Sequence, residues 1–304
     1  MNRVKLIVSF ALSLTCIYSQ AQQEATYAQY MFNGLAINPA YAGQHRALSV
    51  SLLSRFQNVG LPGAPTTQTL AVHSPLANQR FAVGALFVND KIGVITQTQF
   101  SGIYAYRIPI SFQGTLSFGI QAGISRYFAQ YSALDIYQTD PAFSQDIQEV
   151  RPNIGTGAFL DFTNWYIGLS APHMLNNVFT RGSNLTSIHQ PFPIILTGGY
   201  VFLISRAVRF KPNTLIKMVD GRIVEVDLNA NFLFDEVLWA GISYHTSQAL
   251  NFIVDLQLTD QLRLGYSYTA ALGEIKSAEI GSHEIFLGYI FKFNSKGIVS
   301  PRYF

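Results

Sequence analysis

Residues 224–234 read Val-Glu-Val-Asp-Leu-Asn-Ala-Asn-Phe-Leu-Phe, and this stretch decides the fold class. Its even-numbered positions are all apolar, while acidic residues and asparagines fill the odd-numbered positions 225–231. Successive side chains of a β-strand point to opposite faces, whereas a helix aligns every third or fourth residue. The stretch is therefore predicted to be a β-strand with one apolar face and one polar face.

The same alternation recurs along the chain, for example in residues 116–124, 238–244, 252–258 and 262–268. Repeated strong alternation is typical of an antiparallel barrel that crosses a membrane, and bacterial barrels of this kind have an even number of strands. We predict an all-β transmembrane antiparallel β-barrel of about 14 strands, with a plug-like N-terminal segment. The predicted strands are residues 47–56, 66–74, 79–89, 94–108, 113–127, 154–162, 164–171, 194–205, 207–217, 222–234, 236–247, 249–258, 261–270 and 283–293.

The composition favours contact with lipid. Charged residues make up 12% of the chain, about half of the roughly 25% that is usual in soluble domains. Hydrophobic residues make up 49%, and a soluble protein this apolar would have difficulty covering its surface with polar groups. The net charge is only +3 and the basic residues are scattered, so nucleic acid is not an expected partner.

The N-terminus has the pattern of an export signal. Arg3 and Lys5 precede the apolar run Leu6–Ile17, and small residues follow at Ser19 and Ala21. This pattern predicts a signal peptide at residues 1–21, removed after Ala21.

The single cysteine, Cys16, lies inside this signal and is expected to leave with it. A lipoprotein cysteine is the alternative interpretation, but Thr15 is larger than that processing prefers. Without cysteine, the mature chain has neither disulfides nor thiolate sites. The longest apolar run, residues 192–204, contains Pro193 and two glycines. It is too short for a membrane helix, so a closed barrel is the expected way to cross.

The connections between predicted strands predict the orientation. The longest ones, residues 57–65, 128–153, 172–193 and 271–282, all follow odd-numbered strands. Outer-membrane barrels place short turns in the periplasm and long loops outside. Both termini are therefore expected to be periplasmic, with the barrel at residues 47–293 and a periplasmic tail at 294–304.

Residues 22–46 precede the first predicted strand and show no alternation. The segment is too apolar for a free tail, and its Asn-Gly, Asn-Pro and Ala-Gly steps favour bends over a long helix. We predict that it lies in the periplasmic mouth as a plug or brace, with a disordered leader as the alternative. Aromatic residues toward strand ends are expected at the headgroup level of the membrane. They are Tyr104, Tyr106, Trp165, Tyr166, Trp239, Tyr244, Tyr266, Tyr268, Tyr289 and Phe293.

The sequence offers few candidates for catalytic or metal-binding residues. None of the six histidines forms the helical pair of a zinc site. Ser243, His245 and Asp255 offer the residue types of a hydrolase triad, but the serine lacks the surrounding elbow motif. Acidic residues on the inward parity are normal in a polar barrel lumen. Gly155 and Gly157 share one parity, where small residues leave room for neighbouring side chains. We therefore expect neither an enzyme nor a cofactor.

Two motifs in residues 22–46 closely resemble the opening of the PorP/SprF family, outer-membrane proteins of the type IX secretion and gliding machinery. They are Tyr30-Met31-Phe32-Asn33-Gly34-Leu35 and Asn38-Pro39-Ala40-Tyr41-Ala42-Gly43. Further resemblances extend over the whole mature chain, although Asn58 stands where the family pattern implies tryptophan. They are Arg55-Phe56-Gln57 with Gly60, Gly63, Pro65 and Thr67, then Asp90–Gly93, Tyr104–Ile108, Ser282–Ile285 and Ser300–Phe304.

The resemblance implies a binding role in the outer membrane of a Gram-negative bacterium. Its implied partners are secreted proteins with C-terminal sorting domains, periplasmic secretion-ring or peptidoglycan-binding components, and the lipid bilayer. A passive or substrate-specific pore is the alternative function. The candidate partner or plug contacts are Tyr30, Phe32, Asn33, Asn38, Pro39, Tyr41, Gly43, Arg55, Gln57, Gly63 and Pro65.

Overall fold

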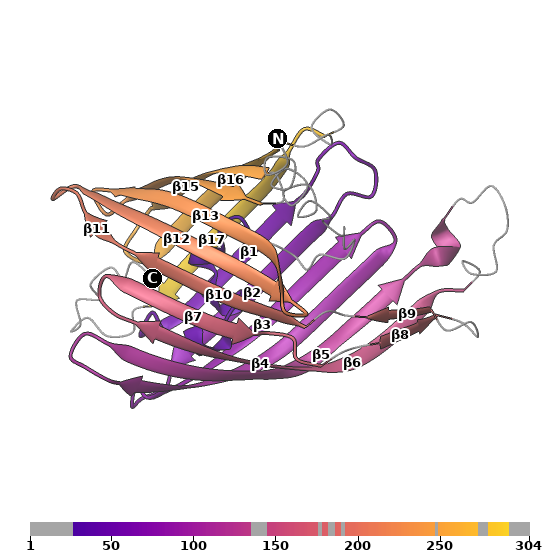
Figure 1. The fold of residues 1–304 in the computed structure, drawn as a ribbon, viewed down its shortest axis with the longest axis horizontal. Helices are drawn as coiled ribbons and strands as arrows, with labels where there is room; N and C mark the ends of the chain where they lie inside the picture. The colour runs from indigo at the N-terminus through magenta and orange to yellow at the C-terminus, as the bar shows by residue number, and fades with distance from the viewer. Residues whose placement is uncertain are drawn as a thin grey trace, which may run out of the picture.

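Fourteen antiparallel strands close into a barrel (Figure 1). The computed structural model describes residues 27–134, 145–175, 178–181, 186–189, 192–246, 249–272 and 279–291. The barrel strands are β1 (Leu48–Phe56), β2 (Thr66–Pro75), β3 (Phe81–Ile92), β4 (Ile95–Pro109), β5 (Thr115–Ala129), β6 (Ile147–Asp161), β7 (Trp165–Ala171), β10 (Pro193–Tyr200), β12 (Val208–Val219), β13 (Arg222–Phe234), β14 (Leu238–His245), β15 (Ala249–Gln257), β16 (Leu262–Ala271) and β17 (Ser282–Phe291). Neighbouring strands pair in this order, and β1 pairs with β17 to complete the ring.

The remaining short elements lie outside this ring of pairings. The two-residue strand β11 (Phe202–Leu203) continues β10 along β12, and β8 (Val178–Arg181) pairs only with β9 (Thr186–His189). In the described part of the chain, three 3-10 helices precede β1, and a fourth follows β5. They are η1 (Tyr30–Phe32), η2 (Gly34–Ala36), η3 (Pro39–Tyr41) and η4 (Tyr131–Ala133).

The structure confirms the predicted strand count, and the main difference concerns β6. This strand begins at Ile147, seven residues before the predicted start at 154, and pairs with β5 along its full length. Glu149 and Arg151 lie on the inward parity, with Val150 and Ile154 on the outward one, so the alternation continues, but Pro152 disfavours a strand interior and obscures it. Backbone pairing with β5 nevertheless holds these residues in the sheet.

The two faces of the barrel wall differ as the alternation predicts. In β13, Leu228 is 56% exposed on the outer face, whereas Asp227 and Asn231 are fully buried on the inner face. Apolar side chains on other strands are likewise outward, among them Ile120, Phe252 and Leu264 at 41–60% exposure. The polar parity therefore lines the lumen, and the apolar parity forms a surface suited to lipid.

The predicted aromatic belt is correct for some residues and wrong for two. Tyr104, Tyr244 and Tyr266 are exposed on the outer face. Trp239 and Tyr166, by contrast, are buried and belong to the interior clusters. Both side chains stand on the inward parity of their strands, so strand position alone is a poor guide to an interfacial aromatic.

A charge on the outer face is expected to destabilise the barrel. Leu228 lies at the middle of β13, and Leu228→Arg should lower the free energy of unfolding by roughly 2–4 kcal/mol in a bilayer. The control is Gln113→Arg in an exposed turn, which should change stability by less than about 0.5 kcal/mol. Urea titration in lipid vesicles measures both. Equal stability of the two variants would contradict the assignment of the outer face.

The two ends of the barrel differ in their connections. The four longest, residues 57–65, 130–146, 172–192 and 272–281, all join strand ends on one side of the barrel, here called the long-connection end. At the opposite end, here called the short-turn end, the connections are short, β1 begins and β17 ends. Within the described ranges, no helix is long and apolar enough to cross a membrane.

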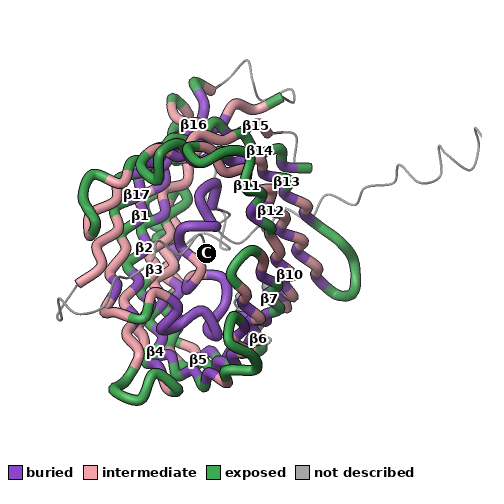
Figure 2. The backbone as a smooth tube through the Cα atoms, turned by 90° about the vertical axis from the view of Figure 1, so that its left-hand side faces the viewer, coloured by how far each residue is buried: buried purple, intermediate pink, exposed green. Residues whose placement is uncertain are grey.

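Residues 27–46, here called the lumen segment, lie inside the ring of strands (Figure 2). Tyr27 contacts Thr69 near the long-connection end, while the Gly43 N–H donates to His73 near the short-turn end of β2. The segment thus extends along the lumen, rather than lying only in one mouth. The predicted signal peptide (1–21) and tail (294–304), with Phe293, lie outside the described residues.

The hydrophobic core of the molecule lies between the lumen segment and the inner wall. One cluster combines Leu35, Ala40 and Tyr41 with inward residues of β2, β3, β4, β6 and β7. A second cluster combines Tyr30, Phe32 and further segment residues with the wall on the other side. The wall residues of this second cluster are Leu53, Ile195, Leu215, Leu233, Trp239, Ile253 and Phe286.

Candidate functional site inside the barrel

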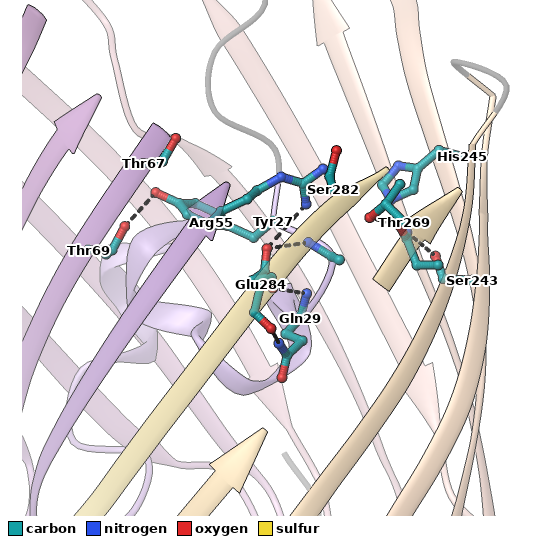
Figure 3. A network of polar contacts seen from close by, with 12 residues as sticks. Tyr27, Gln29, Arg55, Thr67, Thr69, Ser243, His245, Thr269, Ser282 and Glu284 are labelled. Atoms are coloured by element: carbon teal, nitrogen blue, oxygen red, sulfur yellow. Dashed lines mark hydrogen bonds and ion pairs between the residues drawn. The ribbon is translucent and has the colours of Figure 1, made fainter. Parts of the chain in front are cut away.

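A buried carboxylate holds the start of the lumen segment (Figure 3). The two oxygens of Glu284 accept hydrogen bonds from the backbone N–H groups of Ala28 (3.0 Å) and Gln29 (2.8 Å). Arg55, directly opposite Glu284 on the neighbouring strand, lies 3.1 Å from it through Nη1. Both charged side chains are at least 90% buried. Charge-assisted bonds of this kind are stronger than neutral ones, and a buried charge needs them.

Aromatic rings surround the middle of the segment. The ring of Phe32 lies 5.9 Å from that of Trp239 and 6.2 Å from that of Phe286, between centroids. The guanidinium of Arg263 stands 4.0 Å from the centroid of Phe32. It also forms an ion pair with the buried Asp255. The ion pair and the cation–π contact together compensate for the burial of Arg263.

A second cation supports the same region. The Lys211 ammonium, fully buried, lies 5.5 Å from the centroid of Trp239 and 5.9 Å from that of Tyr166. Tyr166 in turn stacks on Phe159, with 5.4 Å between centroids. The inward-facing Trp239 and Tyr166 therefore pack between the barrel wall and the lumen segment. They do not lie at the headgroup level of the membrane.

Glycines of the barrel wall leave room for the turn Asn38-Pro39-Ala40 of the lumen segment. The Asn38 side chain caps η3 by accepting a hydrogen bond from the Ala40 N–H (2.9 Å), and its amide donates to the carbonyl of Ala158 (3.0 Å). A Cβ at Gly119 would collide with the backbone of Pro39 and Ala40, and one at Gly157 would collide with Asn38. The predicted use of Gly157 to make room for neighbouring side chains is confirmed.

The short-turn end of the segment is held through its backbone. Gly43 has φ +77°, and a Cβ there would lie 2.6 Å from that of Ala82, so glycine is required. Its N–H donates to Nδ1 of His73 (3.1 Å), and its carbonyl accepts from Nη1 of Arg107 (2.8 Å). The backbone conformation at Ala42-Gly43 thus directs the chain towards the start of β1.

At the long-connection end, the connection 57–65 is bonded to its neighbours. The Gln57 N–H donates to the carbonyl of Pro65 (2.9 Å), and the carbonyl of Gly63 accepts from the Gly93 N–H (2.9 Å). The Val59 N–H donates to the carbonyl of Gly281 (2.8 Å). This end therefore carries an ordered surface formed by residues far apart in the chain.

Comparison with known protein families identifies the family to which this barrel belongs. Residues 19–289 match the family described as type IX secretion system membrane protein PorP/SprF. The chain belongs to the PorP/SprF family. Among curated proteins, none matches its sequence.

Solved structures similar to this PorP/SprF protein are outer-membrane barrels and channels of low sequence identity. The CymD monoaromatic hydrocarbon channel is 11% identical, with a TM-score of 0.50 over 87% of this chain and 93% of that one. The toluene transporter TbuX of Ralstonia pickettii is 10% identical (TM-score 0.49; 88% and 94% covered). Omp33 of Acinetobacter baumannii is also 10% identical (TM-score 0.44; 81% and 98% covered). The likeness to CymD concerns the fold alone, and this PorP/SprF protein is an outer-membrane β-barrel.

The site residues expected from the sequence divide into two groups in this PorP/SprF protein. The seven in the lumen segment, together with Arg55, are buried and contact the inner wall. Gln57, Gly63 and Pro65 lie at the long-connection end, where Gly63 is exposed. The sequence interpretation missed Glu284, Arg107 and Arg263 as contacts of the segment. Their place on the inward parity of apolar strands was the signal that could have indicated them.

The residue types considered for a hydrolase do not form one in this PorP/SprF protein. The Ser243 hydroxyl donates to Oδ1 of Asp227 (2.6 Å), and Nε2 of His245 lies 2.9 Å from Oδ2 of the same carboxylate. Serine and histidine thus share an acceptor, whereas a nucleophile needs to donate to its base. Asp255 pairs with Arg263 instead. Within the described ranges, no three acidic, histidine or cysteine side chains form a metal-binding group.

Proposed function

We propose that this protein binds secreted substrates of the type IX system and anchors or presents them at the cell surface. Family membership supplies the link to the secretion machinery. The observation that carries the binding role is the packed lumen segment, whose aromatic and charged contacts join both sides of the wall. A lumen filled in this way favours a rigid scaffold for recognition over passive diffusion.

The proposed substrate-binding surface is the long-connection end, which faces outward in this proposal. The strand ends that flank the four longest connections lie at this end of the barrel, and connection 57–65 is bonded to Gly93 and Gly281 of the neighbouring connections. Loops held by a rigid scaffold are the usual place of recognition. The partners are secreted proteins with C-terminal sorting domains, and periplasmic ring or peptidoglycan-binding components contact the short-turn end.

A pull-down from the native membrane in mild detergent tests this proposal. The tagged protein is expected to recover a large secreted protein, and replacing residues 130–146 by a short Gly-Ser turn should abolish that recovery. The control variant lengthens the turn at residues 110–114 at the opposite end, and it should retain the secreted partner. Heat-modifiable migration in gels verifies that each barrel is folded. A partner-free protein that conducts ions in a planar bilayer would contradict the proposal and favour a pore.

A further inference from the structure

Strand β6 lacks a second neighbouring strand over its first residues, at the long-connection end. It pairs with β5 along its whole length, whereas β7 covers its other side only from Thr156 to Asp161. Within the described part of the chain, the only further backbone bond on that side joins the Met174 N–H to the Ile154 carbonyl (2.8 Å). Residues 147–153, here called the open edge, therefore have a described strand on one side only, whereas closure of a barrel normally removes all edges.

The open edge exists because the chain turns inward after β7. The carbonyl of Pro172 accepts hydrogen bonds from the side-chain amides of Gln121 (2.8 Å) and Asn153 (3.2 Å), which are buried on the inner face. The next residue, His173, contacts β4, where its Nε2 lies 2.9 Å from Oε1 of Gln99. These contacts hold the turn inside the barrel, so β7 does not continue along β6.

The position of Pro152 agrees with an edge strand. Alternate residues of an antiparallel strand direct their N–H and C=O groups to opposite sides. Ile154 directs its carbonyl away from β5, so the even-numbered residues before it in β6 do the same. Pro152, which has no N–H group, therefore costs no bond to β5, and proline is tolerated on such an edge. Toward the open side, the edge offers the N–H and C=O groups of Gln148 and Val150.

The outer face beside the open edge is polar. The strand register aligns one outward residue from each of β2 to β6 in a row, namely Gln68, Asn89, Thr98, Arg126 and Val150. The Asn89 side chain is hydrogen-bonded to those of Gln68 (3.2 Å) and Thr98 (2.9 Å). Hydrocarbon accepts neither such a row nor an open sheet edge. The open edge therefore stands in water, and Val150 is 58% exposed there.

We propose that an extended segment of the secreted substrate adds to β6 as an antiparallel strand at the open edge. This strand addition rests on the proposed function and identifies the element that holds the substrate. The edge lies at the end of the barrel assigned to substrate binding, and its backbone groups supply the hydrogen bonds, as in strand addition to other sheets. The turn at Pro172 keeps the place of the added strand free.

The side chains of the open edge indicate what the added strand contains. Glu149 and Arg151 form an ion pair with each other (2.6 Å), so charge on the substrate is not required. The residue beside Val150 is expected to be β-branched or aromatic, because such cross-strand pairs stabilise a sheet. A second copy of this chain fits less well. Two barrels inserted in the same direction would bring their β6 edges together in parallel, which is the less stable pairing.

Val150→Pro tests the proposal, because it removes an N–H group of the open side without removing a bond to β5. In the pull-down from the native membrane, this variant is expected to recover about tenfold less secreted protein than the unaltered chain. Phe112→Pro is the control, because Phe112 is exposed in a turn at the short-turn end. It should recover the secreted protein normally. Heat-modifiable migration verifies that both barrels fold.

Amide hydrogen exchange of the purified protein, with and without its secreted partner, measures the backbone pairing directly. The amides of Gln148 and Val150 are expected to exchange rapidly in the free protein and slowly in the complex. Residues 122–126 of β5 are paired with β4 and β6 in both states. Their exchange should therefore not change, which makes them the internal control.

Three outcomes would overturn the proposal. Normal recovery by Val150→Pro, with unchanged exchange in the complex, would exclude strand addition at β6. The proposed function would still stand if recovery depended on residues 130–146. Slow exchange of Val150 in the partner-free protein would assign the edge to this chain itself or to a second copy. If the unaltered protein recovered no secreted protein, the proposed function would be wrong, and strand addition by a substrate with it.

Discussion

Glu284→Gln is expected to release the start of the lumen segment from the wall. The substitution keeps the shape of the side chain but leaves the Arg55 guanidinium buried without its counter-charge. It also removes one of the oxygens that accept from Ala28 and Gln29. Breaking a buried ion pair on one side costs about 3–5 kcal/mol, which is the expected loss in the free energy of unfolding. Urea titration measures this loss, and chymotrypsin is expected to cleave after Tyr30 or Phe32 in the folded barrel.

Two comparisons make this prediction specific. Glu149→Gln breaks the partly exposed pair with Arg151 and should cost less than about 1 kcal/mol. The double variant Arg55→Gln/Glu284→Gln should recover part of the stability, because no unpaired charge remains buried. If Glu284→Gln were as stable and as protease-resistant as Glu149→Gln, the carboxylate would not be what holds the segment.

Gly119→Ala is expected to displace the Asn-Pro-Ala turn from the wall. The added methyl group would meet the backbone of Pro39 and Ala40, with the Ala40 Cα only 2.6 Å away, and a backbone cannot move aside as a flexible side chain can. Overpacking of this kind costs about 1–3 kcal/mol. We expect a folded barrel whose lumen opens, measured as ion conductance in a planar bilayer, which the unaltered protein is expected to lack.

Gly102→Ala is the matched control for this second prediction. Gly102 is also a strand glycine, but it lies on the outer face, and the nearest atom to an added Cβ is the carbonyl oxygen of Ala122 at 3.9 Å. This variant should remain closed and change stability by less than about 0.5 kcal/mol. Conductance through both variants would show that the wall needs a strand glycine for its flexibility and not for the room it leaves. Conductance through neither would contradict the expectation that the Asn-Pro-Ala turn closes the lumen.

The sequence predicted the strands well because alternation is a local property. Residues 224–234 reveal both faces of β13 without reference to any other strand, and the hairpin turns mark where each strand ends. The failure at β6 has the same origin. Pro152 argues locally against a strand, but pairing with β5 keeps it in the barrel, and pairing depends on a second strand.

The predicted site was only partly correct for a related reason. The motif residues of the lumen segment were identified as contacts, but what they contact was not. Trp239 was expected at the membrane interface, although its flanking residues Leu238 and Ala240 already place it on the inward parity. In this barrel the parity of a residue, and not its distance from the strand end, decides whether its side chain faces the lumen or the lipid.

The sequence by itself determined the positions of most strands, their inner and outer faces, and the likeness to PorP/SprF, because each of these can be found in consecutive residues. Only the tertiary structure decided which inward side chains meet in the lumen. Glu284 binds Ala28 across 256 positions of the chain, and Gly157 makes room for Asn38. Such contacts depend on how closure of the barrel places each strand relative to a segment that has no period of its own. No local pattern contains that information.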